Sequence, residues 1–77
     1  MEIQEFINHF AEQFDETELS KFTSETVFHE LDEYSSLIAL SIIAMVDEEY
    51  GVTLNAGEMS AAVTIADLFN TVKAKAE

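Results

Sequence analysis

The feature that most constrains the fold is a long apolar run at residues 37–50, which lies between a pair of serines and a glycine. The run contains no glycine, proline or basic side chain. Serine is a favourable N-cap because its hydroxyl accepts from free N–H groups of the first helical turn. Glycine readily takes the left-handed conformation that ends many helices. The sequence therefore predicts one long helix that begins at Ser35-Ser36 and ends before Gly51.

This helix has two faces of different kinds. At about 100° per residue, its core stripe comprises Ala39, Ile42, Ile43, Val46 and Tyr50. The opposite face is polar at Ser41, Asp47 and Glu48 and apolar at Leu37, Leu40 and Ala44, with Ile38 and Met45 at its edge. A chain of 77 residues has too few elements to surround a helix, so an apolar outer face is expected to be kept for a partner. We expect the N-terminal half of that face to form a docking surface, with Ser36 at its tip.

A second helical pattern precedes it, at residues 2–15. Its apolar residues follow the spacing of one buried stripe, and they are Ile3, Phe6, Ile7, Phe10 and Phe14. His9 lies off this stripe and is expected in solvent, and the acidic residues near the helix end oppose the dipole, so that end is expected to fray. Residues 17–34 have no sustained period and predict a long loop with one turn at residues 24–29. Phe22, Phe28 and Leu31 are expected to fix this loop to the core.

Two polar segments predict the remaining helices. Asn55 and Glu58 fit a capping box, in which each side chain satisfies the other's backbone N–H, and predict a short helix to about residue 61. Thr64 and Asp67 resemble a second box and predict a helix to about residue 75, whose buried residues would be Ile65, Leu68, Phe69 and Val72. The predicted fold is all-α, a small four-helix bundle with three longer helices, one short helix and a long loop between helices 1 and 2. Residues 1–77 are expected to form a single domain.

The composition excludes several classes of function. With 16 acidic residues against 3 basic ones, the formal net charge is −13, which disfavours nucleic acids and anionic membrane surfaces as partners. A partner with a basic patch would instead be attracted. The chain has no cysteine, which excludes disulfides and thiolate catalysis. No secretory signal and no apolar stretch long enough for a bilayer are visible, so a cytoplasmic protein is expected.

Three segments around the predicted long helix form a distinctive combination. They are the tripeptide Ser35-Ser36-Leu37 at its start, the acidic and aromatic residues 47–52 at its end, and the approach loop at residues 31–34. Together they resemble the acyl carrier proteins and their peptidyl carrier relatives, in which an Asp-Ser-Leu tripeptide opens the second helix. The resemblance extends over nearly the whole chain, including its length, its acidity and the order of its helices. It implies a bundle of the acyl-carrier type.

The resemblance implies a free-standing carrier that is not itself an enzyme. Ser36 would hold a covalent 4′-phosphopantetheine arm, transferred from coenzyme A by a separate phosphopantetheinyl transferase. The thiol of the arm would carry an acyl or aminoacyl intermediate as a thioester, in fatty acid, polyketide or nonribosomal peptide biosynthesis. Further expected partners are acyl-transferring or acyl-activating enzymes with basic and apolar docking patches, and the carrier is expected to be a monomer. The expected partner surface comprises Ser35, Leu37, Ile38, Leu40, Ser41, Ala44, Asp47 and Glu48.

One residue of the tripeptide departs from the family pattern. Ser35 stands where the family usually has aspartate, so the cap is kept but a charge that transferases are expected to recognise is lost. Ile38 and Ser41 likewise replace acidic positions of the family. Without the resemblance, helix capping alone would explain both serines. The departure supports an alternative, an unmodified protein of the same fold that binds a partner through its second helix. An acidic mimic of nucleic acid is disfavoured, because so much apolar surface competes for the exposed faces.

No residue pattern indicates catalysis or a dedicated metal site. Neither histidine takes part in a legible Ser-His-acid order, and His29 beside Glu30 and Glu33 offers one imidazole among exposed acids, a poor transition-metal site. Residues 47–58 place oxygen ligands at calcium-loop spacings, but Val52 occupies the position that requires glycine.

Overall fold

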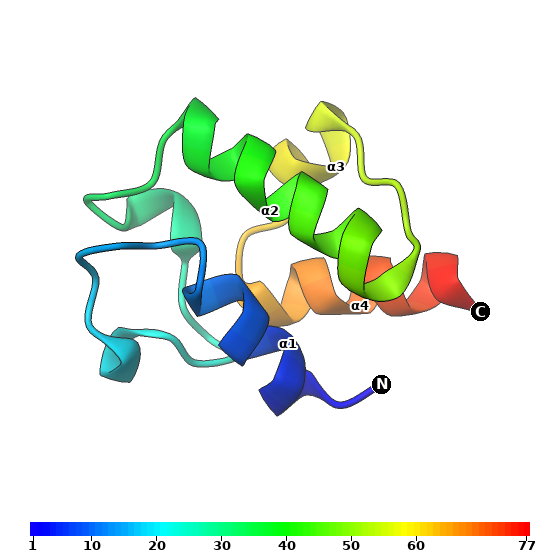
Figure 1. The fold of residues 1–77 in the computed structure, drawn as a ribbon, viewed down its shortest axis with the longest axis horizontal. Helices are drawn as coiled ribbons and strands as arrows, with labels where there is room; N and C mark the ends of the chain where they lie inside the picture. The colour runs from blue at the N-terminus through cyan, green and yellow to red at the C-terminus, as the bar shows by residue number, and fades with distance from the viewer.

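Four α-helices and two 3₁₀ turns make up the computed structural model, which describes residues 1–77. The helices are α1 (Ile3–Ala11), α2 (Ser36–Tyr50), α3 (Ala56–Ala61) and α4 (Ile65–Ala76), and the 3₁₀ turns η1 (Leu19–Lys21) and η2 (Phe28–Glu30) lie between α1 and α2. The predicted all-α bundle, with one short helix and a long loop between the first two helices, is confirmed. In Figure 1, α2 crosses the upper part of the molecule and α4 the part below it. No helix has the length and apolar character that crossing a membrane requires.

The core is built only from apolar side chains, and no polar or charged side chain is buried. Its largest fully buried members are Phe6, Phe10, Phe28, Ile42, Ile65, Leu68, Val46 and Val72. The stripe predicted for α1 is confirmed, since four of its residues are buried and Ile3 packs against them. The four predicted core residues of α4 are also buried.

The first helix is shorter than the sequence predicts. It ends at Ala11, with Glu12 as its C-cap, whereas the apolar pattern extended it to residue 15. Acidic side chains are unfavourable at the negative end of a helix dipole, and the backbone N–H groups of residues 15–17 find a carboxylate acceptor elsewhere. The expectation that His9 lies in solvent is wrong: its side chain is only 23% exposed, and its ring packs edge-on against Tyr50 at 6.0 Å.

Helix α2 begins and ends where the sequence predicts. Ser35 is its N-cap, and Gly51 closes it in the left-handed conformation with a φ of 66°. The buried stripe, however, is rotated from the expected one, because it comprises Ile42, Met45 and Val46. Met45 is therefore in the core rather than at the edge of the outer face. The other predicted core residues of this helix, Ala39, Ile43 and Tyr50, are only partly buried.

Both predicted capping boxes are present, at Asn55 with Glu58 and at Thr64 with Asp67. The shorter Asp67 side chain serves as well as the preferred glutamate, because its carboxylate accepts from the Thr64 N–H at 3.0 Å. Helices α3 and α4 consequently start at Ala56 and Ile65, each one residue after its cap.

The loop between α1 and α2 is fixed to the core by aromatic side chains. Phe22 and Phe28 are buried, and their rings lie 6.2 Å and 5.3 Å from that of Phe10. Leu31 packs against the same core, as predicted, whereas Leu19 is 66% exposed. The segment predicted to form a turn, residues 24–29, contains a turn closed by the Thr26 N–H on the Thr23 carbonyl at 3.1 Å, and η2 begins within it at Phe28.

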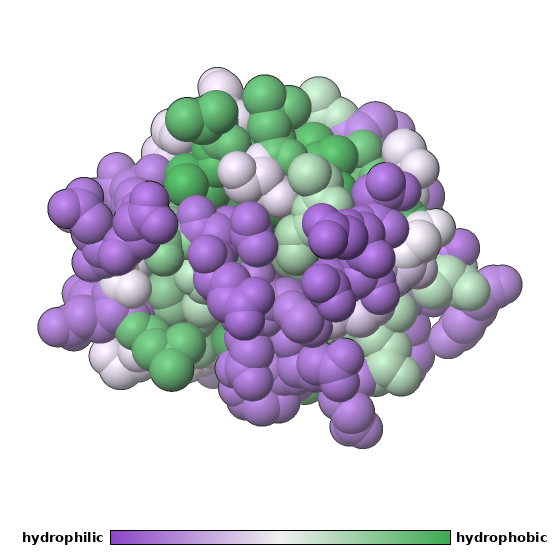
Figure 2. All heavy atoms as spheres, in the orientation of Figure 1, coloured by the Kyte–Doolittle hydropathy of each residue, from purple (hydrophilic) through white to green (hydrophobic).

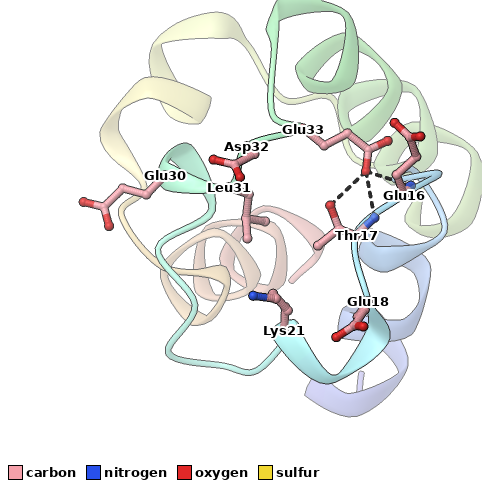
Figure 3. Close-up of a pocket in the computed structure, with 8 residues that line it drawn as sticks. All are labelled: Glu16, Thr17, Glu18, Lys21, Glu30, Leu31, Asp32 and Glu33. Atoms are coloured by element: carbon pink, nitrogen blue, oxygen red, sulfur yellow. Dashed lines mark hydrogen bonds between the residues drawn. The ribbon is translucent and has the colours of Figure 1, made fainter.

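The same loop is also held from outside by one carboxylate. Glu33 accepts hydrogen bonds from the backbone N–H groups of Asp15, Glu16 and Thr17 at 2.6, 2.9 and 3.0 Å, and from the Thr17 hydroxyl at 2.8 Å. Figure 3 shows its carboxylate pointing at Glu16 and Thr17 across the hollow between the two loop segments. The N–H of Asp15, followed by that of Glu16, holds the pKa of Glu33 below its ordinary value of 4.5. The segment after α1 is thus tied to the segment that enters α2.

This tie predicts a pH-dependent contribution of Glu33 to stability. Because the pKa is lowered on folding, the contribution is present above pH 4.5 and is lost as pH falls through the lower, folded value. Glu33→Gln should therefore lower the urea midpoint of unfolding at pH 7, and the difference from wild type should shrink as pH falls below 4.5. Glu30→Gln, an exposed acid of the same loop, is the control for reduced charge repulsion. Equal effects of the two substitutions at pH 7 would contradict the tie.

Candidate functional site

The start of α2 presents Ser36 to solvent in a fixed backbone geometry. The Ser35 hydroxyl accepts from the Ile38 N–H at 3.3 Å, and its carbonyl accepts from the Ala39 N–H at 2.9 Å. Ser36 is the first residue of the helix, and its side chain is exposed. The first turn of α2 contains no acidic side chain, so the positive end of the helix dipole is left uncompensated by carboxylates.

An apolar groove opens directly beside Ser36. It has a volume of about 400 Å³ and lies between α2 and α3. Six of its eight lining residues are hydrophobic, and the full set is Tyr34, Ser36, Ala39, Leu40, Ile43, Ala56, Met59 and Ser60. Burial raises the pKa of the Tyr34 hydroxyl. Ala39 and Ile43 are only partly buried because their side chains face this groove.

The outer face of α2 carries large apolar side chains that nothing in the chain covers. Leu37 is 73% exposed and Leu40 is 63% exposed, and Ala44 is exposed one turn further along. Figure 2 shows hydrophobic atoms gathered along the side of the molecule that α2 forms, above a mostly hydrophilic remainder. Ile38 and Ser41 are partly buried and contribute less to this face.

The charges of the predicted partner surface lie at the other end of the same helix. Asp47 and Glu48 are exposed, but a rise of 1.5 Å per residue places Asp47 about 16 Å along the helix axis from Ser36. The structure thus joins Ser35, Ser36, Leu37 and Leu40 in one place and keeps the acidic residues separate. The last turn of α2 has no basic side chain to neutralise them.

A polar hollow elsewhere on the molecule does not form a recognisable site. It measures about 750 Å³ and lies between the loop segments drawn in Figure 3. Acidic side chains line most of it, together with Lys21 and Leu31. No group of three or more His, Asp or Glu side chains lies close enough to hold a metal ion anywhere in the chain.

The sequence did not indicate the wall that α3 adds to the site. Met59 is buried and lines the groove, and Ala56 and Ser60 flank it. An apolar residue in a short capped helix predicts burial but not which cavity it borders. His29 also contacts this wall, with its Nε2 atom 3.0 Å from the carbonyl oxygens of both Met59 and Ala62, a contact that no sequence pattern signals.

The cap of α2 gives a direct test of how Ser36 is positioned. Ser35→Ala removes the acceptor of the Ile38 N–H and should lower the free energy of unfolding by about 1 kcal/mol. Ser35→Asp keeps an acceptor and should restore it. Urea unfolding at pH 7 measures both, with Ser20→Ala, at an exposed serine of η1, as the control. Equal stability of Ser35→Ala and Ser20→Ala would show that the cap does not hold the helix start.

Comparison with known proteins adds no relative to this description. No family model, curated protein or solved structure matches the chain. The residues of the site and their geometry therefore carry the functional inference.

Proposed function

We propose that the chain is a carrier protein whose Ser36 holds a 4′-phosphopantetheine arm. The observation that carries this proposal is the exposed serine at the first position of α2, beside an apolar groove. The Ser36 oxygen would form a phosphodiester with the phosphopantetheine of coenzyme A, whose nucleotide part leaves. Free N–H groups and the helix dipole favour such an anion at this position.

The groove supports a second part of the same proposal, the shelter of the cargo. The arm is flexible, so a thioester at its end can return to the surface from which it springs. A groove of about 400 Å³ with mainly hydrophobic walls is in the size range of small-molecule pockets and suits a short apolar segment. Linking the intermediate to the carrier raises its effective concentration at each partner. The protein itself would supply no catalytic group.

Partners would be recognised by attraction at long range and by apolar contact at short range. The net charge of −13 attracts proteins with basic patches and speeds their association at low salt. The exposed Leu37 and Leu40 then offer apolar area next to the arm. Such a surface fits acyl-transferring or acyl-activating enzymes with basic and apolar docking patches, and it also fits the transferase that installs the arm.

Intact-protein mass spectrometry tests the proposal. The protein is incubated with coenzyme A and a broad-specificity phosphopantetheinyl transferase, with Ser36→Ala alongside. We expect a single phosphopantetheine increment that is absent from Ser36→Ala. Ser35→Asp is measured in parallel. A mass increment on Ser35→Asp but not on wild type would show that this transferase does not recognise the wild-type protein because it lacks the aspartate before Ser36. No increment on either protein would contradict the carrier function.

A second candidate function is an unmodified interaction protein that uses the same face of α2. The exposed Leu37 and Leu40 and the serine in place of the family's aspartate favour it. This candidate requires no chemistry at Ser36, so the absence of any mass increment would support it. A partner contact that is insensitive to salt would also favour it, since apolar contacts are not screened.

The apolar docking surface makes a separate prediction about the modification reaction. Leu40→Asp should lower kcat/KM for transfer by about tenfold, because a central apolar contact is worth more than about 1 kcal/mol. The urea midpoint should change little, since Leu40 is 63% exposed. Leu19→Asp is the matched control, at a leucine of similar exposure on η1. Modification of both variants at the wild-type rate would show that the docking surface is assigned wrongly. If the transferase does not modify wild type, Leu40→Asp and Leu19→Asp are each combined with Ser35→Asp, and their rates are compared with that of Ser35→Asp alone.

A further inference from the structure

Six exposed residues of α2 form one continuous line along the outer face of the helix. Residues three or four positions apart are neighbours on a helix surface, and the line runs through Ser36, Leu37, Leu40, Ala44, Asp47 and Glu48. It begins at a serine, is apolar in its middle and ends in two carboxylates. Its leucines are 73% and 63% exposed, and they belong to the hydrophobic band that Figure 2 shows along α2.

This line is symmetric about position 42, whose own side chain is buried on the other side of the helix. Leu40 and Ala44 lie at equal distances before and after that position, and so do the first-turn and last-turn residues of the line. A second copy of α2, packed antiparallel across a twofold axis, would place each Leu40 beside the partner's Ala44. A large side chain opposite a small one lets the ridge of one helix enter the groove of the other.

The charges at the two ends of the line are complementary in the same arrangement. The first turn of α2 has no acidic side chain, and its last turn has no basic one. In an antiparallel pair, the carboxylates at the end of one helix lie at the positive end of the other helix dipole, which is favourable. Two copies with a net charge of −13 repel each other in general. The apolar middle of this line lets them approach without opposed carboxylates at the centre of the contact.

We propose that two copies of the chain pair through the outer faces of their α2 helices, antiparallel and centred on position 42. The partner copy brings the carboxylates of its Asp47 and Glu48 to the end of α2 that carries Ser36, and it covers the exposed leucines. Two leucines per copy supply a small contact, so the dimer exchanges with the monomer, with a dissociation constant of about 0.1 to 1 mM. Pairing shields Ser36 from a transferase; this consequence rests on the proposed function, whereas the pairing itself does not.

Sedimentation equilibrium of the unmodified protein, from micromolar to millimolar concentration, tests the interface. We expect a reversible equilibrium between monomer and dimer. Leu40→Asp should raise the dissociation constant about tenfold or more, because it places a carboxylate at the centre of the contact. Leu19→Asp, at a leucine that is 66% exposed on η1, should leave it unchanged. A protein that stays monomeric throughout, or equal dissociation constants for the two variants, would overturn the proposal.

An exchange of charges tests the antiparallel register. Ser36→Glu and Asp47→Lys each suit the dipole of their own helix end, so both variants should fold. In a mixture, the carboxylate introduced in one copy meets the ammonium introduced in the other. Fluorescently labelled Ser36→Glu should therefore bind Asp47→Lys several-fold more tightly than it binds Glu25→Lys, which changes the charge equally at an exposed position of the loop. Equal affinities in sedimentation velocity would overturn the register. Since neither measurement involves modification of Ser36, failure of the proposed function would leave both results unaffected.

Discussion

The carboxylate of Glu33 makes the contacts on which the position of the start of α2 depends. It accepts four hydrogen bonds from residues 15–17 and so joins the segment after α1 to the segment that enters α2. Inside the molecule, the buried ring of Phe28 packs against Phe10 and fixes the same loop from the other side. A loop held at a polar point outside and an apolar point inside has little freedom. Because α2 begins three residues after Glu33, the place of Ser36 follows from these two contacts.

The two halves of α2 carry different kinds of exposed side chain. Its first half carries the exposed serine, the uncovered leucines and one side of the groove, and its first turn has no acidic group. Its last turns carry exposed carboxylates with no basic neighbour in the last turn. Charged side chains attract a partner over about a Debye length, whereas apolar side chains stabilise a complex only when the two surfaces touch. A partner attracted by the acidic end would thus meet the apolar end, where the proposed arm would be attached, once it has docked.

The sequence predicted those features that depend on local chemistry. The caps at Ser35, Asn55 and Thr64 and the left-handed stop at Gly51 define the starts of three helices and one end, because each acts within a few residues. Features that depend on distant partners could not be predicted in this way. The early end of α1 reflects hydrogen bonds to Glu33, the burial of Met45 reflects how α2 packs on its neighbours, and the groove exists only where α3 approaches α2. The contact of His29 with two carbonyls that lie 30 and 33 residues away along the chain belongs to the same class.

Backbone ¹⁵N relaxation is the most direct test of the claim that Glu33 and Phe28 fix the loop that presents Ser36. Order parameters at residues 15–17 and 33–37 should equal those of the helices, at about 0.85. The same measurement on Glu33→Gln should lower the values at residues 15–17 and leave those in α4 unchanged. Values below about 0.6 in wild type would contradict the account, because a mobile loop could not hold the start of α2 in the position described.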